Sequence, residues 1–404
     1  MIMTQVDVTN AKFKANPFPF YAQLRAEAPV FPVTVPMPTK QRAWLITRYS
    51  DVQDVLKDAR FAKNPRNAMS PEQLKKRPWI PSMFKPLEQN MLDLDSPDHT
   101  RLRALVHKAF TPRLIEQMRD EIQTLTDELL DAAEPKGSMD LIADFALPLP
   151  LTIIGRILGV PAKDNDKFHR WTKTLLSAGT NTNYVVFIPI IMRFMGYLKK
   201  LIKERRAHPK DDLVTALVQA KDGSDKLSGD EVLAMIFLLL IAGHETTINL
   251  IGSGSLALLE HPDQLEKLRS EPAIIKPAIE ELLRFVCPVE MATERYARED
   301  ITIAGTTIPR GELVLAVIGS ANRDANYFDN PDCLDVTREN NKHLAFGLGA
   351  HYCLGAPLSR LEGQIAISTL IRRMPNLRLS IAPDQIRWRG GIILRGLEAL
   401  SVSF

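Results

Sequence analysis

Phe346-Gly347-Leu348-Gly349-Ala350-His351-Tyr352-Cys353-Leu354-Gly355 is the stretch that decides the fold, and an amphipathic segment from about Pro357 to Met374 follows it. A cysteine just before a helix lies at the positive end of the helix dipole, where thiolate is favoured over thiol. The glycines permit backbone turns that direct amide N–H groups at the sulfur. We therefore interpret Cys353 as a metal ligand or a nucleophile; the alternative is an ordinary buried cysteine.

Composition excludes several other classes of function. The chain has 404 residues, 45% hydrophobic and 25% charged, which is typical of a soluble globular protein large enough to bury a cofactor. A net charge of +3 gives no case for nucleic-acid binding. Cys287, Cys333 and Cys353 form no C-x-x-C pair, so neither a zinc cage nor a disulfide framework is indicated. We expect a reducing, cytoplasmic compartment.

No segment has the pattern of a signal peptide or a membrane span. The N-terminal region up to Phe31 is interrupted by prolines and has no long apolar run. The longest apolar run, Val232 to Gly243, is shorter than the ~20 residues that a bilayer requires. We interpret it as a core helix and expect a soluble protein.

Periodicity predicts mostly helices and a few strands. Strands are expected at Phe31–Val35, Ala43–Thr47, Ile301–Ile303, Thr306–Ile308 and Leu313–Val317, with further β-like runs in Leu377–Phe404. Helices are expected at Pro19–Glu27, from a Ser50-Asp51 cap through Lys57, and at Pro112–Ala133, Pro148–Leu158, Asp164–Leu176 and Pro272–Phe285. The region from Phe61 to Leu94 is predicted to be a long irregular loop.

The most apolar helix is predicted over Ser228–Glu260, where Ser228 and Glu231 form a capping box. Its centre reads Ala242-Gly243-His244-Glu245-Thr246-Thr247, a poor composition for a buried helix, costing about 1 kcal/mol for the glycine alone. Threonine hydroxyls can bond to carbonyls one turn back and bend a helix. The sequence predicts a distorted helix at this point, either with a chemical role or as a kink without chemistry.

Two pairs of side chains have spacings that suggest a shared task. His99 and Arg103 stand four residues apart in a helix expected to open at Asp95, so both donors lie on one face suited to an anion. They also fit a solvated surface. Glu281 and Arg284 are three apart, close enough for an ion pair, although exposed pairs of this kind contribute little.

These motifs together resemble the cytochrome P-450 superfamily of haem-thiolate monooxygenases. The pattern Phe346-Gly-x-Gly-x-His351-x-Cys353-x-Gly355 resembles the haem-binding loop of that family. The centre of the apolar helix resembles its oxygen-binding motif, and Glu281-x-x-Arg284 with Arg338 resembles its ion-paired triad. The resemblance covers most of the chain, in the right order.

The resemblance implies a role for each residue. Cys353 would be the axial thiolate, Glu245 and Thr246 would deliver protons to the distal oxygen, and Gly243 would leave room for dioxygen. Glu281, Arg284 and Arg338 would hold the loop structure. The residues expected around the haem, including those at its propionates, are His99, Arg103, Ala242, Gly243, Arg295, Phe346, Gly347, His351 and Gly355.

The same resemblance implies a fold and partners. We expect a single domain over residues 1–404, mainly α with a small β-rich region (about 30–50 with 301–318 and 377–404), and haem b between the long central helix and the helix after Cys353. Dioxygen would be the co-substrate. No flavin or iron–sulfur segment is fused to the chain, so electrons from NAD(P)H would arrive through a separate reductase and a ferredoxin or flavodoxin. The docking patch for this acidic redox partner would include Arg360, Arg372 and Arg373. We also expect the protein to be a monomer.

Substrate identity is less constrained. Segments that shape the pocket in this family correspond to parts of 61–94 and 171–191, Leu239–Ala242, Val289–Ala292 and Ile392–Leu394. Their aliphatic character predicts hydroxylation or epoxidation of a lipophilic small molecule such as a fatty acid, terpenoid, steroid or macrolide. Glu290 would either anchor a cationic group of the substrate or be a structural or solvent-facing carboxylate. The tentative pocket residues are Leu239, Ile241, Val289, Met291, Ala292 and Ile393.

Three other functions are alternatives to a monooxygenase: a zinc hydrolase, a cysteine hydrolase and a haem carrier. His244-Glu245 begins like the zinc motif H-E-x-x-H, but Ile248 stands where the second histidine is needed. A hydrolase that uses Cys353 and His351 would explain neither the apolar-helix motif nor the Glu281–Arg284 pair. A non-catalytic haem carrier would need no proton relay, whereas Glu245 and Thr246 are both present.

Overall fold

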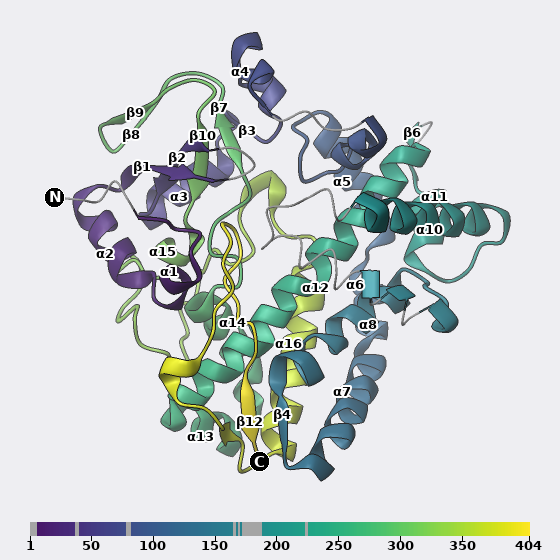
Figure 1. Cartoon of the computed structure of the whole chain (residues 1–404), viewed down its shortest axis with the longest axis vertical. Helices are drawn as coiled ribbons and strands as arrows, with labels where there is room; N and C mark the ends of the chain where they lie inside the picture. The colour runs from purple at the N-terminus through teal and green to yellow at the C-terminus, as the bar shows by residue number, and fades with distance from the viewer. Residues whose placement is uncertain are drawn as a thin grey trace.

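The fold is described from a computed structural model, which covers residues 6–36, 40–77, 82–164, 167–168, 170–171, 188–222 and 225–404. The helix predicted over Asp164–Leu176 and the pocket segment 171–191 lie largely outside these described residues. Figure 1 gives the element labels used below. The α-helices are α1 Ala11–Ala15, α2 Phe18–Glu27, α3 Tyr49–Lys57, α4 Pro71–Lys75, α5 Asp98–Ala109, α6 Pro112–Gln117, α7 Arg119–Ala133, α8 Pro148–Ile157, α10 Ile188–Ala207, α11 Leu213–Gln219, α12 Gly229–Glu260, α13 Pro262–Ser270, α14 Ile275–Val286, α15 Ile318–Ala321 and α16 Ala356–Arg373.

The strands form one main sheet and several small ones. The main sheet has the order β1-β2-β10-β7-β3, with β2 and β10 parallel and the other neighbours antiparallel. A second sheet has the order β11-β12-β4, and β5/β6 and β8/β9 are hairpins. The strands are β1 Val30–Val35, β2 Gln41–Ile46, β3 Phe61–Ala62, β4 Ser138–Asp140, β5 Lys221–Asp222, β6 Asp225–Lys226, β7 Arg295–Ala297, β8 Ile301–Ile303, β9 Thr306–Ile308, β10 Leu313–Ala316, β11 Arg378–Leu379 and β12 Ser401–Ser403.

The helical part of the molecule is arranged around α12. Figure 1 shows the main sheet and the N-terminal helices on one side and the longer helices on the other, with α12 running diagonally between them. This central helix contacts α8, α10, α14 and α16. The predominantly helical fold with small sheets agrees with the prediction.

The start of α12 follows the predicted capping box. Ser228 Oγ accepts from the amide of Glu231 at 3.1 Å, and the Glu231 carboxylate accepts from the amide of Ser228 at 2.7 Å. Within the described residues, α12 is the one helix long and apolar enough to cross a membrane, yet 56% of its most apolar window is buried inside the fold. It is a core helix.

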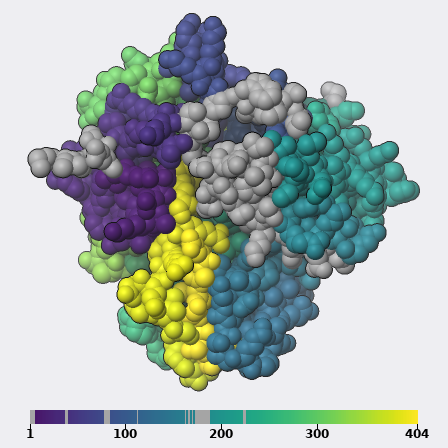
Figure 2. Space-filling model, viewed as in Figure 1, coloured from purple at the N-terminus to yellow at the C-terminus, as the bar shows by residue number. Residues whose placement is uncertain are grey.

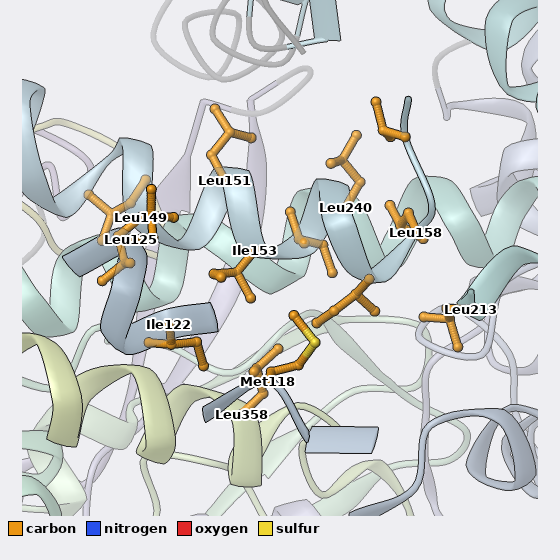
Figure 3. Packing of buried hydrophobic residues seen from close by; sticks show 14 of the residues in the cluster. Met118, Ile122, Leu125, Leu149, Leu151, Ile153, Leu158, Leu213, Leu240 and Leu358 are labelled. Carbon is orange, nitrogen blue, oxygen red and sulfur yellow. The ribbon is translucent and has the colours of Figure 1, made fainter. Parts of the chain in front are cut away.

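The largest hydrophobic cluster joins α12 to its neighbours. Figure 3 shows Ile122 and Leu125 of α7, Leu149 and Ile153 of α8, and Leu240 of α12 in this cluster. These side chains have almost no solvent exposure. Burial of a leucine or isoleucine side chain contributes about 1.5–3 kcal/mol, so the packing of this cluster holds α12 firmly in position beside the site.

Several boundaries differ from the prediction. Helix α3 begins at Tyr49 instead of after a Ser50 cap, because the Tyr49 amide donates to the Asp324 carboxylate at 2.9 Å, a partner remote in sequence. The region 61–94 contains β3, α4 and 3-10 turns as well as loop. The C-terminal strand β11 pairs with β12, and β12 pairs with β4, so 377–404 does not join the main sheet as strands. Contact with the N-terminal part comes from the Gly391 amide, which donates to the Thr9 carbonyl at 2.8 Å, and from Arg395, which donates to the Lys14 carbonyl at 2.8 Å.

Candidate active site

The cysteine loop has a backbone that only glycine adopts without strain. Gly347 and Gly349 have φ of 69° and 72°. A Cβ at Gly349 would lie 2.9 Å from the Leu56 carbonyl oxygen in α3, so the loop packs directly on that helix. The Cys353 amide donates to the Phe346 carbonyl at 2.9 Å, which closes the loop just before α16. The thiol is thereby fixed in front of a helix N-terminus.

The Cys353 thiol faces an enclosed space. Its side chain has accessible surface, yet desolvation raises the pKa of the thiol. Accessibility together with desolvation means that the sulfur faces a space within the protein and not bulk water. The amides of Gly355 and Ala356 and the charge of Arg103 act in the opposite direction and lower this pKa. Such donors stabilise a thiolate, the form that binds metal.

The middle turns of α12 also line an open space. Ala242 is exposed, and Gly243 and Thr246 are half-buried, although the helix around them is buried. Thr246 Oγ1 donates to the Ala242 carbonyl at 3.2 Å, the bond to a carbonyl one turn back that the sequence indicated. A Cβ at Gly243 would lie 3.4 Å from Ile154 of α8, an ordinary van der Waals distance, so α8 borders this glycine.

Glu245 has a partner that the sequence did not reveal. Its half-buried carboxylate lies 3.7 Å from the guanidinium of Arg389, which belongs to the C-terminal segment. Desolvation raises the pKa of Glu245, and the Arg389 charge opposes this shift. A carboxyl with a raised pKa that retains some access to solvent is suited to accept and release a proton.

Four separate segments bring basic side chains together. The rings of His99 and His351 lie 4.1 Å apart, and Arg103 donates to the Tyr352 carbonyl at 2.7 Å. Arg295 is buried. Lys63, which was not predicted, is also buried and donates to Thr293 Oγ1 and the Glu294 carbonyl at 2.7 and 2.8 Å.

Burial and mutual repulsion destabilise the charges of this basic cluster, defined as Lys63, His99, Arg103, Arg295 and His351. Desolvation is the main cause in each case: it lowers the pKa of Lys63 to about 7, of Arg295 to about 10 and of His351 to about 3. Neighbouring members of the cluster lower the pKa of Lys63 and His351 further.

The basic cluster fits an anionic group. His99 Nε2 and His351 Nδ1 are buried and have no protein partner within hydrogen-bond distance. The carboxylate of Asp95 beside them is already engaged by the amides of Lys63 and Asn64 and by Asn67. Buried basic groups without counter-charges are costly. A cofactor with carboxylates at its edge and a metal that accepts one thiolate would therefore match both the cluster and Cys353.

An ion-pair network connects α14 to the segment before the cysteine loop. Glu281 and Arg284 are fully buried and form a two-bond pair at 2.8 Å. Arg338 Nε donates to the same carboxylate at 3.0 Å. Arg284 also donates to the carbonyls of Asn322 and Pro331 at 2.9 and 2.7 Å. The structure thus brings the three predicted residues together in the interior and excludes the exposed-pair alternative.

Two of the three arginines expected at a docking patch are balanced by carboxylates. Arg360 pairs with Glu280 at 2.7 Å and lies 4.5 Å from the Phe346 ring. Arg373 pairs with Asp127, Asp131 and Glu134. These pairs reduce the positive charge that this face offers to an acidic partner.

The predicted pocket residues divide into two groups. Leu239, Ile241, Val289 and Ile393 are partly accessible. Met291 is 0% exposed in the core below the main sheet, and Ala292 is nearly buried, so neither presents much surface to a ligand. Glu290 accepts from Tyr21 and pairs with Lys14 at 3.1 Å in the interior, which favours the structural interpretation.

The hydrolase alternatives find little support in this geometry. No group of three or more His, Cys, Asp or Glu side chains is arranged for a metal ion within the part of the chain that the structure describes. His244 is buried and its Nδ1 lies against the Leu240 carbonyl of its own helix. His351, the partner required by a cysteine hydrolase, packs on His99.

Comparison with known proteins gives consistent matches along the chain. A family model described as Cytochrome P450 matches residues 8–385. The polyketide biosynthesis cytochrome P450 PksS of Bacillus subtilis (strain 168) is 44% identical over 97% of this chain and 96% of its own length. Its solved structure superposes with a TM-score of 0.92 and covers 99% of both chains at 43% identity. The solved structure of P450BioI in complex with hexadec-9Z-enoic acid-ligated acyl carrier protein superposes with a TM-score of 0.86. It is 40% identical and covers 98% of this chain and 100% of that chain.

Proposed function

This chain belongs to the cytochrome P450 family and is a P450 monooxygenase, and on that premise we propose that the Cys353 thiolate would hold the iron of a haem b. The family requires haem, dioxygen and electron donors, and its members bind an organic substrate. Thiolate-ligated haem supplies activation of dioxygen. The remaining chemistry is carried by side chains of this protein.

The basic cluster would hold the haem propionates. His99 Nε2 and His351 Nδ1 are free to donate to an anion once protonated or in the appropriate tautomer, and Arg103 and Arg295 supply permanent charge. Lys63 adds a fifth basic group, although its ammonium already donates to protein oxygens. Ala242 and Gly243, with Phe346, Gly347 and Gly355, would lie against the faces of the ring.

Glu245 and Thr246 would move protons. Thr246 Oγ1 bonds to the Ala242 carbonyl at 3.2 Å and can exchange that bond for one to an acceptor in the open space. Glu245 lies one residue before it and has a raised pKa with an arginine partner. The Glu281–Arg284–Arg338 network would keep the cysteine loop in register and contact no substrate.

The observation that carries this proposal is the setting of the Cys353 thiol. Its accessible surface faces an enclosed space, two amide groups stabilise its thiolate form, and exposed Ala242 on the most apolar helix lines an open space as well. An ordinary structural cysteine would be packed, as Cys287 is.

We propose an acyl or polyketide chain as the substrate class, with hydroxylation or epoxidation as the reaction. The relatives named above act in polyketide biosynthesis or were solved with an acyl carrier protein that carries a fatty acid. The accessible aliphatic side chains Leu239, Ile241, Val289 and Ile393 suit such a chain. A low- to high-spin shift on titration with long-chain fatty acids or macrolactones tests this assignment, and a shift with compact terpenoids or steroids alone would contradict it.

Partner and compartment follow the same family premise. We propose a monomer of one domain over residues 1–404 that receives electrons from NAD(P)H through a separate reductase and a ferredoxin or flavodoxin. Cys287, Cys333 and Cys353 are all free thiols, which fits the reducing cytoplasm.

The proposed ligand is tested by exchanging Cys353 for serine. The ferrous carbon monoxide complex of the parent protein should show the strongly red-shifted Soret band of thiolate ligation, and Cys353→Ser should lose it. Cys333→Ser is the matched control, because Cys333 is also an exposed, free cysteine but lies in the meander, the irregular segment 322–345 between α15 and the cysteine loop. Retention of the band in Cys353→Ser, or its loss in Cys333→Ser, would refute the assignment.

A further inference from the structure

One edge of α12 carries a row of polar side chains that starts at the proposed site. Glu245, Asn249 and Ser253 follow at intervals of four residues, and Glu260 lies seven residues further on. Residues four and seven apart in a helix share one face. The row therefore runs along a single edge, from the middle of the helix to its C-terminal end.

Two members of this row have unsatisfied oxygens in the interior. Asn249 and Ser253 are each 2% exposed, and neither Asn249 Oδ1 nor Ser253 Oγ has a protein partner within hydrogen-bond distance. A buried polar atom without a partner costs about 1–3 kcal/mol. Polar sites of this kind are commonly satisfied by bound water.

The C-terminal segment covers the same edge. Arg389 contacts Glu245, and its amide donates to the Gly396 carbonyl at 2.9 Å. A Cβ at Gly396 would overlap the Asn249 side chain, so Asn249 lies against the bare backbone of this segment. In Figure 1 the segment is the yellow chain near α12, and Figure 2 shows it reaching the surface between the N-terminal and α7–α8 regions.

The row ends in a hollow of about 400 Å³. Ser253 and Glu260 of α12 line it, together with His261 and with Asp384 and Trp388 of the C-terminal segment. Glu260 and Asp384 are exposed, so the hollow is open to solvent. Desolvation raises the pKa of Glu260 even so. Ser253 lines this hollow although its hydroxyl is buried, so among the buried members of the polar row it is the one next to the solvent-accessible space.

We propose that this hollow is the proton entry of the enzyme, and that water held by Asn249 and Ser253 connects it to Glu245. Side chains four residues apart have Cβ atoms about 6 Å apart, a gap that a bridging water can span. Each proton that Glu245 passes toward Thr246 is replaced by one from solvent in the hollow, and no electron moves along the path. Asn249 and Ser253 are positioning residues, since they act through water on Glu245. The inference rests on the proposed proton-delivery role of Glu245.

The test compares Ser253→Val with Ser253→Thr. These two variants have the same shape and the same β-branched backbone preference, and they differ only in the hydroxyl. Ser255→Val is the matched control, because Ser255 is 3% exposed on the same helix, has an equally unpartnered Oγ, and lies off the Glu245 edge. All variants are studied as holoproteins with a substrate that gives the spin shift, and their unfolding temperatures are recorded.

Two measurements are made. A high-resolution crystal structure of the parent protein should show water bonded to Asn249 Oδ1 and Ser253 Oγ, which Ser253→Thr retains and Ser253→Val loses. The fraction of electrons released as peroxide instead of product should rise about threefold in Ser253→Val, well below the full effect of a general acid. Its solvent deuterium isotope effect should increase, while Ser253→Thr and Ser255→Val stay near the parent values.

A dry Asn249–Ser253 gap in the parent, or equal peroxide fractions in Ser253→Val and Ser253→Thr, would overturn the entry path. Glu245→Gln separates this result from a failure of the proposed function. If Glu245→Gln raises the peroxide fraction while the two Ser253 variants agree, the path is wrong and the relay stands. If Glu245→Gln changes nothing, the relay itself is wrong, and the inference falls with it.

Discussion

Glu362 is a carboxyl buried without a partner. It lies on α16 at 1% exposure, and neither oxygen has a protein partner within hydrogen-bond distance. Burial raises the pKa of Glu362 to about 8, and the nearby Thr247 hydroxyl acts in the opposite direction. At neutral pH the side chain is therefore mostly a neutral acid. The Thr247 hydroxyl instead donates to Ser359 at 3.2 Å.

This buried acid predicts a pH-dependent stability. The unfolded chain ionises Glu362 above about pH 4.5, whereas the folded protein retains the proton up to about pH 8, so the unfolding free energy falls as pH rises between these values. The whole interval corresponds to roughly 5 kcal/mol at 1.36 kcal/mol for each pKa unit. Glu362→Gln has no titrating group, so the unfolding temperature of Glu362→Gln minus that of the parent should increase from pH 5 to pH 8.

Calorimetry of both holoproteins across this range measures the difference. The side-chain amide of Glu362→Gln also lacks partners, so the difference in unfolding temperature at pH 5 alone tests nothing. The tested quantity is the change of this difference with pH. Parallel stability curves would show that the carboxyl is ionised in the folded protein.

Glu362 could have been found from the sequence, and two other residues could not. It stands four residues from Leu358 and from Ala366, on the apolar face of α16, where a carboxylate is out of place. Arg389 and Lys63 carry no such signal. Each approaches the site from a segment distant in sequence, and only tertiary packing brings Arg389 to Glu245 or Lys63 to Thr293.

Helix α14 is held to the meander by buried charge. The Glu281 carboxylate accepts from Arg284, Arg338 and Asn341 and from the Asp335 amide. Removing one partner of a buried pair costs about 3–5 kcal/mol, because the remaining charge is left uncompensated. Glu281→Gln should lower stability by this amount and reduce haem incorporation, since Arg338 leads directly into the cysteine loop. Denaturant unfolding and the haem-to-protein absorbance ratio measure both effects.

The control for this prediction lies on α13. Glu266 and Arg269 have the same i, i+3 spacing as Glu281 and Arg284, at 3.8 Å, but the Glu266 side chain is 70% exposed. Exposed pairs contribute about 0–1 kcal/mol, so Glu266→Gln should change little. If both variants lost a similar amount of unfolding free energy, burial would not explain the contribution of the Glu281–Arg284 pair to stability.

Elements were predictable where local signals determine them. The capping box of Ser228 and Glu231 predicted the start of α12, and two short apolar segments joined by a proline-rich turn predicted β1 and β2 to within two residues. The start of α3 was wrong because Asp324, far along the chain, satisfies its first amide. The pairing of β12 with β4 could not be predicted from the sequence either, because neither three-residue strand carries a pattern that determines its register.

The basic cluster is a property of the whole molecule, since its members come from the residue after β3, from α5 and β7, and from the cysteine loop. The net charge of the chain is only +3, yet these groups gather with little anionic compensation around one interior site. Their mutual repulsion and desolvation oppose folding until an anionic cofactor binds. A ligand that binds only the folded state stabilises it in proportion to its affinity, so haem should contribute strongly to stability.

Lys63→Met tests this balance, because its effect should have opposite signs with and without haem. Burial lowers the pKa of Lys63 to about 7, so the unfolded chain binds this proton more strongly than the folded protein. Without haem, Lys63→Met should raise the unfolding free energy by up to roughly 4 kcal/mol at pH 7, a gain that shrinks as the pH rises toward 10.5, where the lysine of the unfolded chain also loses its proton. With haem, the variant lacks one cation at the propionates and should lose haem faster to an acceptor protein. Lys200→Met, on the exposed face of α10, should change neither quantity.

The contradicting outcome is a haem-free Lys63→Met protein that is less stable than the parent, together with unchanged haem retention. It would show that Lys63 acts through its bonds to Thr293 and Glu294 and not through its charge.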